Sequence, residues 1–267
     1  MVLNTTSNAT SHASPKPNSS FGLSDFRISE IVSRLLLGAA IIAPISLALA
    51  NTAQAQYRTP PPPPDAPEAG RGGGDRSFCP ALAADVDITA LIPSPEDWGT
   101  TITPTPTVWL NAAYEKGEIE ELPPAALYVL DRTTGDVIDL QELVVLPNTP
   151  GTFSLSLPVL PTENKWYEWY LELDCTPAND PDNFSYLEIG GLIYFDSTVA
   201  SSEAVQAKTP AEQIVFYEEN GVWYDLLDHQ VQTQCADGDS VEVSAPISIL
   251  LENGGLGVVQ STEIICP

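Results

Sequence analysis

The sequence predicts a mainly β protein, an antiparallel β-sandwich of immunoglobulin or fibronectin type with a small helical C-terminal part. Three observations lead to this fold class. Short segments with strand character follow one another between residues 86 and 196, and turn signals such as "TTGD" and "PNTPG" separate them. After Thr198 the spacing of the apolar residues changes to that of helices.

The strand pattern is clearest in two segments. In "TFSLSLP" (152–158), Phe153, Leu155 and Leu157 share one face and polar residues share the other. In "KWYEWYLELDC" (165–175), Tyr167, Trp169, Leu171, Leu173 and Cys175 share one face, and Trp166, Glu168, Tyr170, Glu172 and Asp174 share the opposite one. Further strands are expected at 86–92, 105–113, 125–131, 136–146 and 186–196. The pair Gly190-Gly191 in the last of these suggests a β-bulge.

Three helices are expected in the C-terminal part. Thr209 and Glu212 have the spacing of a capping box, and Pro210 occupies the first turn, where its missing N–H costs nothing. This helix should end at Asn220-Gly221. A second helix has one apolar stripe, formed by Trp223, Leu226, Leu227 and Val231. A third is expected within residues 247–259, ended by Gly254-Gly255.

The chain divides into four parts by composition. Residues 1–55 have the features of a signal peptide with a long polar n-region: residues 35–50 are uncharged and mostly apolar, and Ala53 and Ala55 precede the expected cut. Retention of this segment as an anchor is the alternative. Residues 56–77 form a Pro/Gly-rich linker, residues 78–198 the β-sandwich, and residues 199–267 the helical part packed on it.

Charge and cysteines restrict the partners and the compartment. The formal net charge is −26, which disfavours nucleic acid and anionic lipid, so the expected partner is a protein or a glycan. No membrane insertion is expected after signal cleavage. The four cysteines are an even number and contain no CxxC pair, which favours two disulfides and export to the periplasm or the cell surface. Of three possible pairings we prefer Cys79–Cys175 and Cys235–Cys266.

Several strings, in this order, resemble a known family. They are "RGGGDRSFCP" (71–80), "ITALIP" (88–93), "TPTVWL", "NKWYEWYLELDC", "NGVWYDLLD" (220–228) and "LLENGGLGVV" (250–259). Together they resemble the cyanobacterial family catalogued as domain of unknown function 928. The resemblance implies an exported domain without assigned activity and supports the pairing of Cys79 with Cys175. The resemblance assigns no catalytic residue. The pairing of Cys235 with Cys266 rests only on the even number of cysteines.

Candidate sites are few. Trp166 and Tyr170 could form an aromatic platform for a sugar or peptide, unless the helices cover that face with Trp223 packed on Trp166. Trp223 itself fits core packing better than a ligand site. A calcium ion could bind at Asp180 and Asp182 or at Asp237 and Asp239, although turn-forming residues explain both stretches. No other cofactor is expected.

The expected function is that of a non-enzymatic binding or interaction module at or near the cell surface. One alternative is a structural or assembly protein of the cell envelope. Another is a hydrolase that uses carboxylates. For catalysis, His229 lies near Asp225 and Asp228, but a surface histidine beside acids explains this pattern better, and no nucleophile motif accompanies it.

Overall fold

The computed structural model describes Tyr57, residues 61–62, Cys79 and residues 87–94, 96–114, 122–177, 180, 182, 184–236, 240–257 and 263–267. The chain divides into two compact units, Met1–Asn51 and Thr52–Pro267, and every described residue belongs to the second. The signal peptide expected over residues 1–55 therefore lies outside the described residues, as does most of the linker. None of the helices in the described part has the length and hydropathy of a membrane span.

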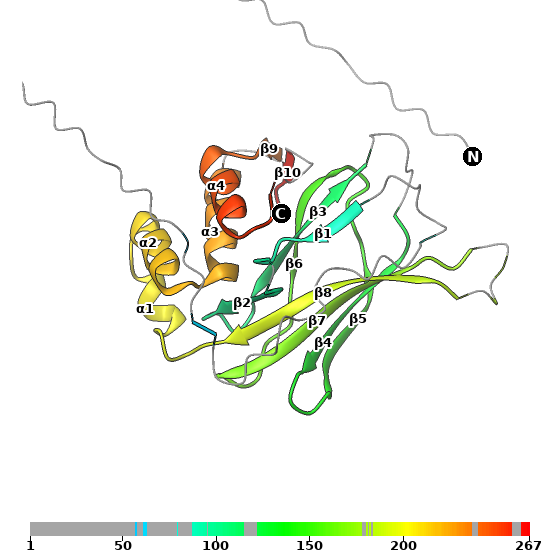
Figure 1. Cartoon of the computed structure of the whole chain (residues 1–267), viewed down its shortest axis with the longest axis horizontal. Coiled ribbons are helices and arrows are strands. Elements are labelled where there is room, and N and C mark those ends of the chain that lie inside the picture. Colours follow the sequence, from blue (N-terminus) through cyan, green and yellow to red (C-terminus); the bar gives the residue numbers. More distant parts are fainter. Residues whose placement is uncertain are drawn as a thin grey trace, which may run out of the picture. The chain divides into compact units, whose positions relative to one another are not determined.

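The described strands form two five-stranded sheets (Figure 1). The first sheet has the order β1 (Asp87–Ala90), β3 (Thr107–Ala113), β6 (Gly151–Ser156), β10 (Glu263–Ile265) and β9 (Ser240–Glu242). The second sheet has the order β2 (Trp98–Thr101), β8 (Tyr186–Phe195), β7 (Lys165–Asp174), β4 (Ala125–Asp131) and β5 (Val137–Val144). The fold is therefore mainly β, as expected.

The finer expectation of an immunoglobulin or fibronectin type is not confirmed. Most neighbouring strands are antiparallel, but β2 runs parallel to β8 and β10 runs parallel to β6. In addition, β9 and β10 belong to the C-terminal part that was expected to be helical, and both join the first sheet. Both sheets place buried apolar side chains in one core, among them Val108 and Leu110 from the first and Leu127 and Trp169 from the second.

The four helices follow β8 in the chain: α1 (Ser202–Gln206), α2 (Pro210–Asn220), α3 (Trp223–Cys235) and α4 (Ala245–Asn253). The predicted capping box is present at the start of α2, where the Thr209 hydroxyl accepts from the Glu212 N–H and the Glu212 carboxylate accepts from the Thr209 N–H. Gly221 ends α2 with a left-handed φ of 66°. Helix α3 contacts β2 of the second sheet and β3 of the first, and thus links the two sheets.

The aromatic stripe of α3 packs on the core. Trp223 is fully buried, and its indole N–H donates to the Leu91 carbonyl oxygen over 2.9 Å. The neighbouring Tyr224 accepts a hydrogen bond from Trp169, which faces the core from β7. Trp166 faces the other side of that strand, so the expected packing of Trp223 on Trp166 is wrong. Tyr57, from the predicted linker, is also buried and lies edge-on to Trp223 at 4.9 Å.

The bulge expected at Gly190-Gly191 is absent, because the pairing of β7 with β8 runs without a shift from Lys165 to Asp174. The two glycines instead allow close approach. A Cβ at Gly191 would lie 2.0 Å from the Ile92 Cδ1, and one at Gly190 would lie 2.2 Å from the Trp169 carbonyl oxygen.

Two disulfides join Cys79 to Cys175 and Cys235 to Cys266, the pairs preferred from the sequence. The first connects Cys79, which precedes β1 in the chain, to the residue that follows β7. The second connects the last residue of α3 to the segment after β10. Two disulfides in one chain are typical of an oxidising environment.

Candidate binding face

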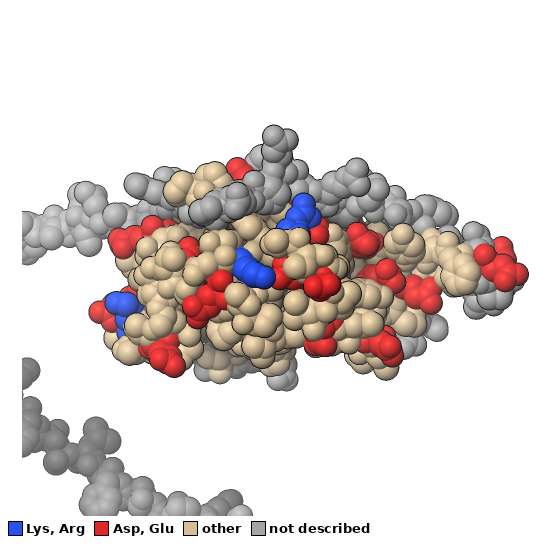
Figure 2. Space-filling view, turned by 90° about the horizontal axis from the view of Figure 1, so that it is seen from below, with Lys and Arg blue, Asp and Glu red and all other residues tan. Residues whose placement is uncertain are grey.

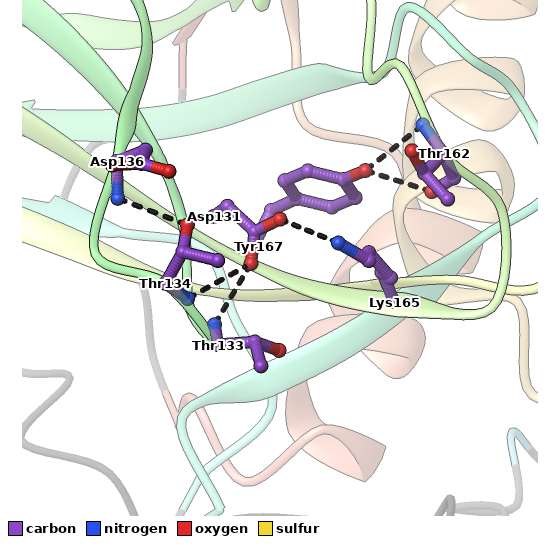
Figure 3. A network of polar contacts seen from close by, with 7 residues as sticks. All are labelled: Asp131, Thr133, Thr134, Asp136, Thr162, Lys165 and Tyr167. Carbon is purple, nitrogen blue, oxygen red and sulfur yellow. Dashed lines mark hydrogen bonds and ion pairs between the residues drawn. The ribbon is translucent and has the colours of Figure 1, made fainter.

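The turn between β4 and β5 is held by a network of polar contacts that centres on Asp131 (Figure 3). One carboxylate oxygen accepts from the Thr133 N–H over 2.8 Å, and the other accepts from the Lys165 ammonium over 2.7 Å. Nearby, the Tyr167 hydroxyl donates to the Thr162 carbonyl oxygen and accepts from the Thr162 N–H. The bond from Lys165 is the main cause that lowers the pKa of Asp131. This network fixes the turn at the end of the second sheet, and the carboxylate of Asp131 is occupied by structural partners.

The acids of α3 also have structural roles. The carboxylate of Asp225 accepts hydrogen bonds from the Thr101 hydroxyl at the end of β2, and from the Ile102 N–H and the Thr103 hydroxyl just after it. Asp228 accepts from the Trp109 indole N–H over 3.1 Å. Burial raises the pKa of both carboxyl groups, and these hydrogen bonds oppose that increase. Both oxygens of Asp225 are thus occupied by groups that attach α3 to the sheets.

The histidine that the sequence suggested for catalysis stands beside these acids without contacting a nucleophile in the described residues. The His229 ring lies 6.1 Å from the Tyr217 ring in an edge-on arrangement. Its Nε2 atom is buried and has no hydrogen-bond partner within the described part of the chain. The carboxylates nearest in sequence, Asp225 and Asp228, bind other donors.

The calcium prediction stays a prediction. Asp237 and Asp239 lie outside the described residues, as do Asn179 and Asn183 next to the other candidate pair. Asp180 and Asp182 are described, but no group of three or more His, Cys, Asp or Glu that could hold a metal occurs among the described residues.

The outer side of the second sheet, which faces away from the common core, carries a pair of adjacent tyrosines. Tyr128 on β4 and Tyr170 on β7 are directly opposite each other in the strand pairing, and both are partly exposed. On the next strand Gly190 is opposite Tyr170, and a Cβ there would lie 2.7 Å from the Tyr170 Cδ1. The ring of Tyr170 therefore lies across Gly190, close to the sheet. Such a ring offers a flat surface to a ligand.

Carboxylates border this tyrosine pair. Glu168 lies beside the Tyr170 hydroxyl, and Glu172 lies beside the Tyr128 hydroxyl. Burial, together with the negative charge of these glutamates, raises the pKa of both tyrosines. Glu168 also accepts from Arg132 over 2.8 Å in an exposed ion pair. Acidic side chains outnumber basic ones over the surface seen in Figure 2.

Further along the same outer side, Trp166 belongs to a small aromatic cluster. Its ring lies edge-on to Trp98 at 5.5 Å and tilted against Tyr194 at 5.1 Å, and Leu192 completes the group. Trp166 is only 6 % exposed. Of the three candidate binding residues, Tyr170 thus presents accessible ring surface, Trp166 supports the sheet beside it, and Trp223 lies in the core. The sequence pattern gave no sign of Tyr128, because its pairing with Tyr170 depends on the register of β4 with β7.

Comparison with known proteins gives one family. The family model described as "Domain of Unknown Function (DUF928)" matches residues 71–264. No curated protein matches the chain. Among solved structures, an engineered protein shares 19 % sequence identity over 42 % of this chain, with a TM-score of 0.26. The chain spans one fifth of that protein, and this local similarity bears on neither fold nor function.

Proposed function

Because the chain belongs to the family described as Domain of Unknown Function (DUF928), whose description assigns no activity, we propose its function from the geometry: an exported, non-enzymatic binding module that holds a protein partner. The observation that carries this proposal is the tyrosine pair, Tyr128 and Tyr170, on the outer side of the second sheet. Flat aromatic rings bordered by carboxylates suit cationic or amphipathic groups, through ring stacking and charge.

Two further observations support the proposal. The two disulfides fit an oxidising compartment, and the apolar run at residues 35–50 fits an export signal. Asp225 and Asp228, the acids beside His229, are engaged in attaching α3 to the sheets. A binding role requires no such reactive group.

The test is a thermal-shift measurement on the chain with both disulfides intact. The probes are a Lys-rich peptide with interspersed Val, neutral glycans, calcium and EDTA. A ligand at 100 times its dissociation constant stabilises the folded state by about 2.7 kcal/mol, which raises the melting temperature by several degrees. We expect this increase with the peptide, and we expect Tyr170→Ala to remove most of it.

Phe184→Ala is the matched control, because this aromatic side chain is 82 % exposed and precedes β8 outside the tyrosine pair. It should leave the peptide effect unchanged. An increase in melting temperature with glycans alone would indicate that the tyrosine pair binds a saccharide and not a protein. An increase with calcium that EDTA reverses would instead support a calcium site at Asp180 and Asp182 or at Asp237 and Asp239. If Tyr170→Ala and Phe184→Ala reduce the peptide-induced increase in melting temperature equally, the tyrosine pair is not the binding site.

A second candidate function is assembly of the cell envelope. Exposed apolar side chains favour it, in particular Leu143 and Val145, which are 74 % and 86 % exposed at the end of β5. Apolar groups at this exposure serve contacts between proteins in many assemblies. Self-association of the purified chain, measured by sedimentation over a range of concentrations, would favour assembly over binding of a different partner.

A further inference from the structure

Strand β5 forms an edge of the second sheet. It is eight residues long and, among the described strands, pairs only with β4. The backbone N–H and C=O groups on its other side therefore have no strand to pair with in the described part of the chain. A long edge of this kind is a template for another strand, and soluble proteins usually shorten, cover or charge such edges.

The exposure of β5 is unusual for a strand with this composition. Val137 is 56 % exposed, Leu140 is 39 % exposed and Leu143 is 74 % exposed. Val and Leu are the residue types usually found in internal strands. Edge strands are more often protected by lysine or proline, which these positions lack. The edge therefore has both the backbone groups and the apolar contacts that an added strand would use.

The register assigns the side chains of β5 to two different surfaces. Leu140 is opposite Tyr128, so it lies on the outer side and extends the tyrosine pair toward the edge. Asp139 is opposite Val129, whose side chain is buried in the core, so Asp139 lies on the core-facing side, where it is exposed. An added strand would thus meet an apolar group on one surface and a carboxylate on the other.

The charge of β5 decides the chemistry of the occupant. Asp139 and Glu142 are both exposed and have no ion-pair partner among the described residues. A second copy of this chain would bring the same two acids and a formal net charge of −26 to the edge. Like charges on paired strands are unfavourable, whereas Lys or Arg across from Asp139 would gain a favourable contact.

We propose that β5 accepts an extended segment of a basic protein as an added strand, in which apolar residues alternate with Lys or Arg. This inference rests on the proposed binding function and names the partner class. The apolar side chains of the segment pack beside Leu140, next to the tyrosine pair. Its basic side chains face Asp139, and its backbone pairs with the free side of β5.

The experiment measures the affinity of synthetic peptides for the chain with both disulfides intact, by fluorescence anisotropy. One peptide has the length of β5 and alternates Lys with Val. A second has the same composition in two blocks, Lys and then Val, and therefore the same charge without the alternation. We expect the alternating peptide to bind at least about tenfold more tightly, since only it can place all Val on one face.

Methylation of peptide N–H groups tests strand pairing directly. In a paired strand, alternate N–H groups point to opposite sides, so one set faces β5 and the other faces solvent. Methyl groups on one set should weaken binding by about tenfold or more, and methyl groups on the other set should leave it nearly unchanged. Equal effects of both sets, or equal affinity of the alternating and block peptides, would overturn strand addition.

Two variants separate this inference from the proposed function. Asp139→Lys should lower the affinity for the alternating peptide by about tenfold at low salt. Asp136→Lys is its control, because this exposed residue precedes β5 and makes the same charge change. If Tyr170→Ala weakens binding while Asp139→Lys and the methylated peptides do not, the tyrosine pair binds the partner without β5. If neither peptide binds, both proposals fail for basic partners.

Discussion

At Asp131 a single carboxylate connects the β4–β5 turn to the first residue of β7. Its hydrogen bonds lower its pKa in the folded state, so its contribution to stability is complete above the unfolded value of about 3.9 and is lost as pH falls through the lower folded value. The same ion pair raises the pKa of Lys165, whose contribution persists up to about pH 10.4 and decreases as pH rises further.

We therefore predict that Asp131→Asn lowers the free energy of unfolding at neutral pH by about 1–3 kcal/mol, because the N–H groups and the ammonium lose a charged acceptor. The difference between wild type and variant should decrease as the pH falls below about 4. Denaturant unfolding between about pH 2 and 7, with disulfides intact, measures both. Asp136→Asn, at an exposed residue of the same turn, should show neither effect; a constant difference for Asp131→Asn over this pH range would contradict the assignment.

Single residues also show what could and could not be predicted from the sequence. The apolar stripe through Trp223 predicted that this residue is buried, but periodicity defines a face of a helix and not the surface on which that face packs. Trp223 belongs to the core shared by the two sheets, and Trp166 lies on the other side of β7. Asp225 was seen only as a neighbour of His229, because its donors come from Thr101 to Thr103, more than a hundred residues earlier.

Helix α2 is an element whose ends follow from local chemistry. The capping box at Thr209 and the left-handed Gly221 were both predicted, because each depends on neighbours within a few residues. Strands β6 and β7 were predicted from alternation along the strand, and β1, β3, β4, β5 and β8 from their strand-forming composition between turns. In contrast, β2, with the sequence "WGTT", has no alternation to detect and exists because it pairs with β8. The short β9 and β10 likewise depend on distant partners.

The local origin of the α2 cap gives a prediction. Thr209→Ala should lower the free energy of unfolding by about 1 kcal/mol, because the Glu212 N–H loses its acceptor. Ser244→Ala is the matched control. Ser244 also precedes a helix, α4, but its side chain makes no capping hydrogen bond, so the change should stay within about 0.5 kcal/mol. Equal losses in the two variants, measured by urea unfolding, would show that the Thr209 cap contributes nothing specific.

On the scale of the whole molecule, the sequence predicted a mainly β fold because alternation and turns recur through half of the chain. The arrangement of the strands into two sheets could not be predicted, since sheet order depends on contacts between distant segments. The same limit applies to the candidate face. Tyr170 could be identified from its own strand, whereas Tyr128, Gly190 and Leu140 join it only through the register of four strands.

The positions of the two disulfides determine how the molecule responds to mechanical force. When the chain is pulled from both ends, tension passes through the bond from Cys79 to Cys175 and the bond from Cys235 to Cys266, which bypass segments with separations of 96 and 31 residues. Between the two bonds, the stretch from Cys175 to Cys235, with β8 and α1 to α3, bears the load directly. Strands β4, β5 and β7 lie inside the first bypassed segment.

Single-molecule pulling should therefore give a short extension with intact disulfides. After reduction, the bypassed segments should add about 3.4 Å for each residue. Equal extensions before and after reduction would contradict this load path. If the proposed partner binds β5, a pull along the chain would not peel that strand away, and the contact would remain until the bonds are reduced.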